Sequence, residues 1–265
     1  MASALHFRVA ARTDVGKKRS QNEDAFGLFP ELDLYVVADG IGGHVGGRVA
    51  SAMAVEEIQR SLAQKRQDDL TPVLDQHGHS SVGGRCLVLA LQDANDKIRD
   101  ASEGDPSLRG MGAVVAALAF DAKNGLAAVC HVGDARVYRV RGDDIAQLTE
   151  DHTVVQRLLK SGRIAPEDIE STPNRHMITR ALGVEPLVQP DLLLEPAEPG
   201  DLFVLSSDGL HDVVTPDEIC RVVGALRGNL EAACTQLIEL ANERGGKDNS
   251  TVLIVDCQPG TGAPH

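Results

Sequence analysis

Two apolar runs that each end in Asp-Gly constrain the fold of this chain most. One covers residues 34–40 and ends in Asp39 and Gly40, and the other covers residues 202–209 and ends in Asp208 and Gly209. A short apolar run bounded by turn residues predicts a strand that is covered on both faces. Each strand would carry a carboxylate at its end, followed by a glycine that lets backbone or a ligand approach closely.

Acidic residues stand at two further predicted strand ends. Glu23 and Asp24 precede one apolar run, and Asp248 precedes another. Two carboxylates about 4 Å apart repel each other by about 4 kcal/mol at an effective dielectric near 20. Nothing nearby in the sequence supplies enough cationic side chains to offset this repulsion, whereas two divalent cations would cancel it. All-oxygen ligand sets suit Mg²⁺ or Mn²⁺, and two-metal sites are typical of phosphate ester hydrolysis.

The composition excludes several classes of partner. The net charge of −13 argues against binding to nucleic acid or to anionic membranes. The chain has no Trp, two Tyr and five Phe, so its core depends on aliphatic side chains. The five cysteines have no metal-binding spacing, residues 1–11 lack the apolar core of a signal peptide, and no apolar run reaches the length of a membrane span. We therefore expect a cytoplasmic protein.

Runs of predicted strands, then paired helices, then strands again favour an α+β domain over alternating βαβ units. We expect one domain over residues 1–257, an irregular flap over about 146–185 that carries a short helix near 154–160, and a disordered tail over 258–265. Residues 67–84 are predicted to form a loop. Strands are predicted at 6–12, 25–29, 34–38, 113–120, 125–132, 135–140, 192–194, 202–205 and 250–255, and helices at 47–65, from about 87 to 98, at 216–226 and at 229–243.

Seven short motifs, in a fixed order between residues 12 and 256, make the chain resemble the metal-dependent Ser/Thr protein phosphatases of type 2C in their compact bacterial form. Each motif alone is weak, but the ordered set is very specific. The resemblance implies a central sandwich of two antiparallel sheets flanked by helix pairs (four layers, αββα), with a metal cleft at one end. The motifs are residues 19–24 (RSQNED), 39–44 (DGIGGH), 110–112 (GMG), 132–136 (VGDAR), 178–183 (ITRALG), 207–210 (SDGL) and 247–251 (KDNST).

The resemblance also implies a role for each metal-binding residue. Asp39 would bridge two Mn²⁺ or Mg²⁺ ions, with the Gly40 carbonyl as a further ligand. Asp208 and Asp248 would hold one ion, while Glu23 and Asp24 would support the other, partly through water. Taken alone, each aspartate would more often cap a turn or a strand end, and only the set of four favours a metal site. A water between the ions, with its pKa lowered from about 15.7 toward 7, would attack phosphorus without a phosphoenzyme.

Three other residues have predicted roles with structural alternatives. Arg19 stands where the family has its phosphate-binding arginine, and a guanidinium can hold two phosphate oxygens; alternatively it is a solvated surface residue. His44 could protonate the departing Ser or Thr alkoxide, or could be a turn histidine. Asp134 could hold a third, weaker ion, or could bond its own turn.

The chain departs from the family pattern at a few positions. Ala113 and Val114 replace two threonines, Ala135 replaces a serine and Thr153 replaces another serine. The first three of these changes remove hydroxyls near the site, and the set puts rate and selectivity in doubt more than metal binding. The expected metal carboxylates are all present, which argues against an inactive relative.

The sequence thus predicts a monomeric phosphatase that hydrolyses phosphoserine and phosphothreonine on proteins and reverses the action of a bacterial Ser/Thr kinase. The charged side chains of the flap (Arg157, Lys160, Arg163, Glu167, Asp168 and Glu170) suit a phosphoprotein, although a solvated lid explains them as well. Two other functions stay open: a hydrolase of small phosphate esters, and a phosphoprotein-binding module of the same fold without turnover.

Overall fold

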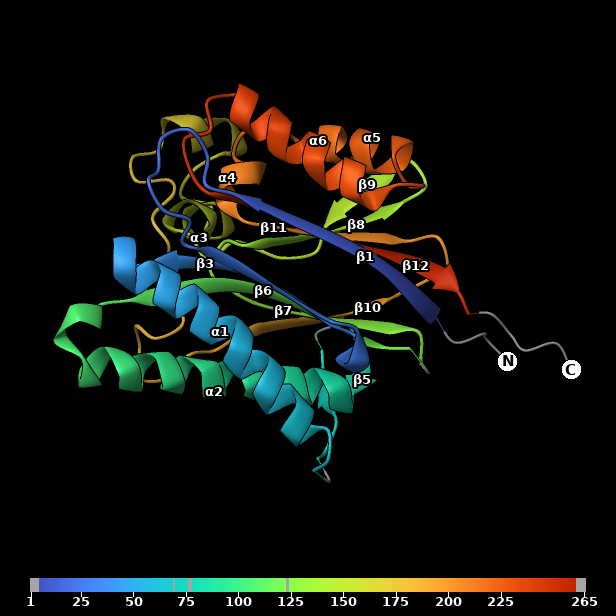
Figure 1. Cartoon of the computed structure of the whole chain (residues 1–265), viewed down its shortest axis with the longest axis horizontal. Helices are drawn as coiled ribbons and strands as arrows, with labels where there is room; N and C mark the ends of the chain where they lie inside the picture. The colour runs from blue at the N-terminus through green and yellow to red at the C-terminus, as the bar shows by residue number, and fades with distance from the viewer. Residues whose placement is uncertain (1–4, 69, 76–77, 123, 261–265) are drawn as a thin grey trace, which may run out of the picture.

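The computed structural model describes residues 5–260 except 69, 76–77 and 123, and the side chains of His44 and Glu170 lie outside that description. Two five-stranded sheets form the centre (Figure 1). In spatial order, sheet A contains β1 (Leu5–Asp14), β12 (Ser250–Pro259), β11 (Leu202–Ser206), β8 (Arg136–Arg141) and β9 (Asp144–Gln147). Sheet B contains β10 (Asp191–Pro196), β7 (Leu126–Val132), β6 (Gly112–Asp121), β3 (Leu34–Ile41) and β2 (Asp24–Phe29).

A pair of helices covers the outer face of each sheet (Figure 1). The helices α1 (His44–Lys65) and α2 (Val82–Gly104) pack on sheet B, and α5 (Pro216–Ala225) and α6 (Leu230–Glu243) pack on sheet A. Each strand pair within the two sheets is antiparallel. The predicted α+β class and four-layer αββα order are confirmed.

The apolar runs are strands because both of their faces are buried. In β3, Leu34 and Val36 pack toward the helices, whereas Tyr35 and Val37 pack between the sheets. The period of two residues therefore sends every second side chain to a different apolar core. The two sheets meet through aromatic and aliphatic side chains; the Phe120 ring in β6 contacts the Phe203 ring in β11 edge to face, with 5.3 Å between centroids.

The region predicted as a loop at 67–84 is partly regular, so that prediction is wrong in part. It contains two antiparallel strands of two residues each, β4 (Val73–Leu74) and β5 (Ser80–Ser81), and the first turn of α2. The helix begins at Val82 because the Ser81 Oγ accepts a hydrogen bond from the Gly84 N–H at 3.0 Å. Hydrophobic periodicity did not predict this start, because Gly83 and Gly84 are poor helix formers.

Short helical elements lie between the main ones. The predicted helix over 154–160 is confirmed as α3 (Val154–Lys160), and the Thr153 hydroxyl caps it by accepting from the Gln156 N–H. The helix predicted from 47 begins three residues earlier, at His44, and α4 (Asp208–His211) was not predicted. The 3₁₀ turns, also not predicted, are η1 (Pro30–Leu32), η2 (Pro106–Leu108) and η3 (Pro166–Ser171).

Two predicted boundaries need correction. The flap was expected from 146, but β9 continues to Gln147 as an edge strand of sheet A. The tail was expected to be disordered from Gln258, but Gln258 and Pro259 continue β12 opposite His6 and Leu5. Pairing with β1 supplies hydrogen bonds that composition alone does not reveal. Residues 261–265 lie outside the described residues.

The five cysteines are free and buried. Among the helices of the described residues, none combines the length and the hydropathy that crossing a bilayer requires. The fold therefore rests on its two sheets and their helices, without a disulfide among these cysteines.

Candidate active site

The predicted carboxylates gather at one end of the sandwich because the antiparallel strands that carry them begin and end there. Asp24, the first residue of β2, is the direct cross-strand partner of Asp39 in β3. Asp208 follows the end of β11, and Asp248 lies two residues before β12. Leu5 and Pro259 pair at the opposite end of sheet A. Residues more than two hundred positions apart in the sequence thus meet.

The central carboxylates are buried and repel one another. Burial raises the pKa of Asp39 well above its usual range, and Asp24, Asp208 and Asp248 raise it further by their charge. Burial also raises the pKa of Asp208 well above its usual range, and the charges of Asp134 and Asp248 raise it further. Burial also raises the pKa of Asp24 to about 6. Positive charge beside these groups would therefore favour their carboxylate forms.

Within the part of the chain that the structure describes, two carboxylate oxygens at this end are buried without a hydrogen-bond partner. They are Oδ1 of Asp24 and Oδ1 of Asp208. The other oxygen of Asp24, Oδ2, accepts hydrogen bonds from the Ser207 Oγ at 2.7 Å and the Thr251 Oγ1 at 2.6 Å. These hydroxyls orient Asp24 and leave Oδ1 for another partner. An unpaired buried carboxylate oxygen is costly, so the residues fit an oxygen-binding divalent cation.

Glu23 and Gly40 lie together where β3 leads into α1. The Gly40 N–H donates to the Glu23 backbone carbonyl at 3.1 Å. A Cβ atom placed on Gly47 would lie 2.0 Å from the Glu23 Oε2 and 2.8 Å from the Gly40 carbonyl oxygen. Gly47 therefore lets these two predicted ligands come close together, a role that the sequence reading missed.

Arg19 lies beside the cluster. Its Nη2 donates to the Asp248 Oδ2 at 2.6 Å, and about half of its side chain is exposed. This hydrogen bond raises the pKa of Arg19, and the charges of Asp248, Glu23 and Asp208 add to the shift. The guanidinium is therefore at the mouth of the cluster, and not on a remote surface. His44 is the first residue of α1, and its side chain lies outside the described residues.

Asn249 connects the segments that carry the carboxylates. It belongs to the motif at 247–251, but the sequence predicted no role for it. Its Oδ1 accepts from the Glu23 N–H at 2.8 Å, while its Nδ2 donates to the carbonyls of Val15 and Gln21. The Asn249 amide thus ties the segment before β2 to the start of β12. An asparagine beside a predicted ligand was the available signal.

Asp134 lies in the turn between β7 and β8, beside a cavity of about 260 Å³. Burial raises the pKa of Asp134 to about 6. Asp212, which was not predicted, also lines this cavity, and its Oδ2 lies 3.4 Å from the His176 Nδ1 of the flap. Arg136 forms a two-pronged ion pair with Asp151 there. The position of Asp212, four residues after Asp208, was the available signal.

The replaced hydroxyl positions lie in the core. Ala113 packs toward the helices and Val114 packs between the sheets. Ala113 also exchanges two backbone hydrogen bonds with Leu182, at 3.1 and 2.8 Å. Ala135 is buried with the residues between the sheets. The side chains at these three positions therefore belong to the apolar packing of the core.

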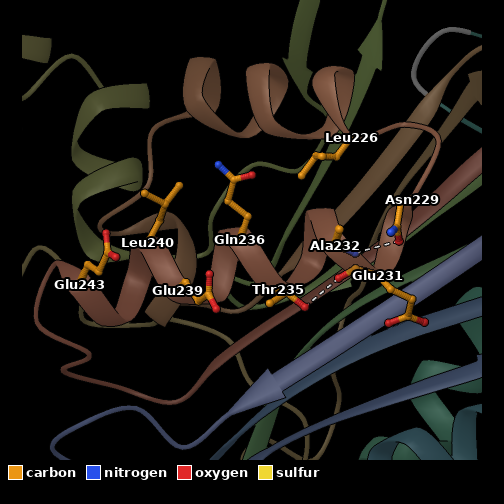
Figure 2. Close-up of a pocket in the computed structure, with 9 residues that line it drawn as sticks. All are labelled: Leu226, Asn229, Glu231, Ala232, Thr235, Gln236, Glu239, Leu240 and Glu243. Atoms are coloured by element: carbon orange, nitrogen blue, oxygen red, sulfur yellow. Dashed lines mark hydrogen bonds between the residues drawn. The ribbon is translucent and has the colours of Figure 1, made fainter.

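A hollow of about 740 Å³ lies elsewhere, along α6 (Figure 2). Glu231, Glu239 and Glu243 line it together with Leu226 and Leu240. None of its lining residues belongs to the predicted site. The size of a hollow therefore does not identify the active site in this fold.

Comparison with known proteins identifies the family. A family model described as protein phosphatase 2C matches residues 16–244. The chain belongs to the protein phosphatase 2C family. It is 33% identical over 250 residues to the protein phosphatase PhpP of Streptococcus pneumoniae. The aligned residues cover 93% of this chain and 96% of PhpP.

Solved structures of protein phosphatase 2C relatives agree with the fold. The serine/threonine phosphatase PstP of Mycobacterium tuberculosis superposes with a TM-score of 0.82 at 34% identity, over 96% of this chain and 99% of that one. A structure of the PstP catalytic domain in complex with two manganese ions gives a TM-score of 0.78 at 35% identity, with the same shares covered. The family resemblance and the phosphatase class predicted from the motifs are confirmed.

Proposed function

We propose that this chain hydrolyses phosphoserine and phosphothreonine on proteins, with two Mn²⁺ or Mg²⁺ ions bound by its carboxylate cluster. The observation that carries the proposal is the pair of buried, unpartnered oxygens of Asp24 and Asp208 among carboxylates whose pKa values are raised. Membership of the protein phosphatase 2C family supports the same chemistry.

Two ligand groups would hold the ions. Asp39, the Gly40 carbonyl and Glu23 would serve one ion, with Asp24 in support, and Asp39, Asp208 and Asp248 would serve the other; Asp134 would hold a third, weaker one. When bound, the two main ions supply a water whose lowered pKa makes it a nucleophile near neutral pH. The oxygen-only donor set suits hard cations.

The side chains around the ions would bind the substrate. Arg19 would hold the phosphate through two N–H groups, and its present partner Asp248 keeps the guanidinium at the mouth of the cluster. We propose that His44 donates a proton to the leaving Ser or Thr oxygen. Ser207 and Thr251 fix the Asp24 carboxylate by donating to its Oδ2.

The test is hydrolysis of p-nitrophenyl phosphate by the purified chain. We expect activity with Mn²⁺, loss of activity in EDTA, and a loss of at least about 10³-fold in Asp39→Asn, because that change removes the carboxylate shared by both ligand groups. Asp100→Asn is the matched control, since the Asp100 side chain is 73% exposed and should leave turnover unchanged. Full activity in Asp39→Asn would refute the proposal.

The substrate class needs a separate comparison. We propose that phosphoproteins, in particular a bacterial Ser/Thr kinase and its substrates, are the partners, and that the enzyme acts as a cytoplasmic monomer in one domain over residues 1–257. Rates on phosphothreonine peptides should exceed those on nucleoside monophosphates. The reverse order would favour a hydrolase of small esters, and tight Mn²⁺ binding without turnover would favour a binding module.

A further inference from the structure

A second cluster of chemically active side chains lies beside the Gly133–Asp134 turn. His131 lies in β7 and His152 lies just before α3. Both residues are buried, and their rings stack with 4.6 Å between centroids. The His152 Nε2 lies 3.2 Å from an oxygen of Asp191, the first residue of β10. The Arg180 Nη1 lies 2.7 Å from the other oxygen of Asp191.

The hydrogen bonds of His152 determine its tautomer. The Gly133 N–H points to the His152 Nδ1 at 3.1 Å, and a backbone N–H can only donate. The Nδ1 is therefore the unprotonated acceptor, so the Nε2 carries the proton and faces the Asp191 Oδ2 at 3.2 Å. A metal ion at Nε2 would require the proton on Nδ1, where it would face the Gly133 N–H. The Arg180 Nη1 also lies 3.1 Å from Nε2, but its two N–H groups have other acceptors, the Asp191 Oδ1 at 2.7 Å and the Gln189 carbonyl at 3.3 Å, so Nε2 keeps its proton. The guanidinium cation there opposes a metal ion as well. This arrangement argues for a positioning role over metal binding.

His152 and Gly133 hold each other from both sides. Besides the ring contact, the His152 backbone N–H donates to the Gly133 carbonyl at 2.9 Å. Gly133 has φ of +100°, and a Cβ there would lie 2.2 Å from a Val114 side-chain carbon. The turn thus takes a backbone conformation that few residues adopt, and both of its polar backbone atoms are bonded to one residue.

The same residue closes the base of the flap. The His152 carbonyl accepts from the Thr179 N–H at 2.6 Å, and Thr153 forms an isolated antiparallel bridge with Ile178. The two ends of the flap therefore meet at His152. The base of the flap and the turn that carries Asp134 are therefore in direct contact at His152.

We propose that His152 is a positioning residue: its neutral, Nε2-protonated ring accepts a hydrogen bond from the Gly133 N–H and so holds the Asp134 carboxylate beside the predicted metal ligands Asp39 and Asp208. The inference rests on the proposed function only through the role of Asp134 as a ligand. Residues that orient metal ligands in this way typically change metal affinity by about 10–100-fold when they are lost.

Two variants separate this role from packing. In His152→Asn the side-chain oxygen can take the place of Nδ1 and still accept from Gly133, whereas in His152→Gln the polar atoms lie where Nε2 was. Both variants lose the stacked ring. His131→Asn removes the other ring of the stack but leaves the Gly133 contact intact, so it controls for lost stacking.

Two readouts do not depend on turnover. Amide hydrogen exchange of Gly133 in the metal-free protein should be about tenfold faster in His152→Gln than in the wild type, and within about twofold of the wild type in His152→Asn and His131→Asn. In calorimetric titration, the weakest resolved Mn²⁺ site should weaken by about tenfold only in His152→Gln. The ¹H–¹⁵N spectrum of the wild type should show an unprotonated His152 Nδ1.

Equal exchange at Gly133 in His152→Asn and His152→Gln would overturn the inference, as would equal Mn²⁺ affinities in the two variants. A protonated Nδ1 in the wild type would overturn it too. Failure of the proposed function has a different signature, because the wild type would then not hydrolyse p-nitrophenyl phosphate with Mn²⁺, whatever the exchange and titration experiments give.

Discussion

Asp24 combines a raised pKa with one satisfied and one unpartnered oxygen. The Ser207 and Thr251 hydroxyls favour the carboxylate, but burial outweighs them and raises the pKa of Asp24 to about 6. A carboxyl whose pKa is higher in the folded protein than in the unfolded chain favours folding when it is protonated. That stabilisation is lost as the pH rises through the folded-state pKa. Without metal, Asp24 therefore opposes folding at neutral pH.

This gives a prediction for Asp24→Asn in EDTA. Relative to the wild type, the variant should gain about 1 kcal/mol in unfolding free energy between pH 5 and pH 7.5, since the wild type loses a proton there and the variant does not. Comparison with the wild type is needed because burial lowers the pKa of His131 and His211, which makes stability rise with pH over a neighbouring range. Urea unfolding at several pH values measures the difference, and a constant difference would contradict the prediction.

At the scale of elements, the join between β11 and α4 depends on close backbone contact. A Cβ on Gly209 would lie 1.9 Å from the Asn249 carbonyl oxygen and 2.8 Å from the Ser250 hydroxyl. The second Asp-Gly therefore contains glycine because another backbone segment passes there, the one that carries Asp248. The sequence predicted that backbone or a ligand approaches the glycine of each Asp-Gly. At Gly209 the approaching group is the protein's own backbone at Asn249.

We predict that Gly209→Ala disturbs the site, because the added methyl group must displace the backbone around Asn249. Phosphatase activity should fall by at least about tenfold, and the unfolding free energy should fall by about 1–3 kcal/mol. Gly224→Ala is the matched control: Gly224 is an exposed residue within α5, and a Cβ there would meet nothing within 4 Å. It should raise stability by about 0.5–1 kcal/mol. Equal effects of the two substitutions would contradict the argument.

At the scale of the whole molecule, the core and the site occupy different ends of the strands. Phe120 is at the far end of β6 from Gly112, and its ring packs against Phe7, Tyr35 and Phe203 from both sheets. Four of the chain's few aromatic residues thus join the sheets at one end, while the carboxylates lie at the other end.

Phe120→Ala should therefore lower stability without changing the chemistry. We expect a loss of about 3–5 kcal/mol in unfolding free energy, with kcat within about threefold of the wild type at a temperature where the variant stays folded. Denaturant unfolding and the p-nitrophenyl phosphate assay measure the two quantities on the same preparation. A tenfold loss of kcat in the folded variant would show that the two ends are coupled.

Local patterns in the sequence determined much of this protein. Apolar runs such as residues 34–38 predicted strands, and helical spacing predicted α5 and α6 within about one residue, since period and burial are local signals. The order of the motifs identified the family. Periodicity failed at the start of α2 and at the end of β12, where a serine cap and a partner strand decide the structure.

Only the tertiary structure decided which groups face one another. Asp24 opposes Asp39 through strand register, Arg19 pairs with Asp248 across more than two hundred residues, and His152 supports the Gly133 turn from the base of the flap. Gly47, Asn249 and Asp212 join the site for the same reason. Such contacts depend on how strands align and layers stack, and the free energy of that packing is not contained in any local stretch of sequence.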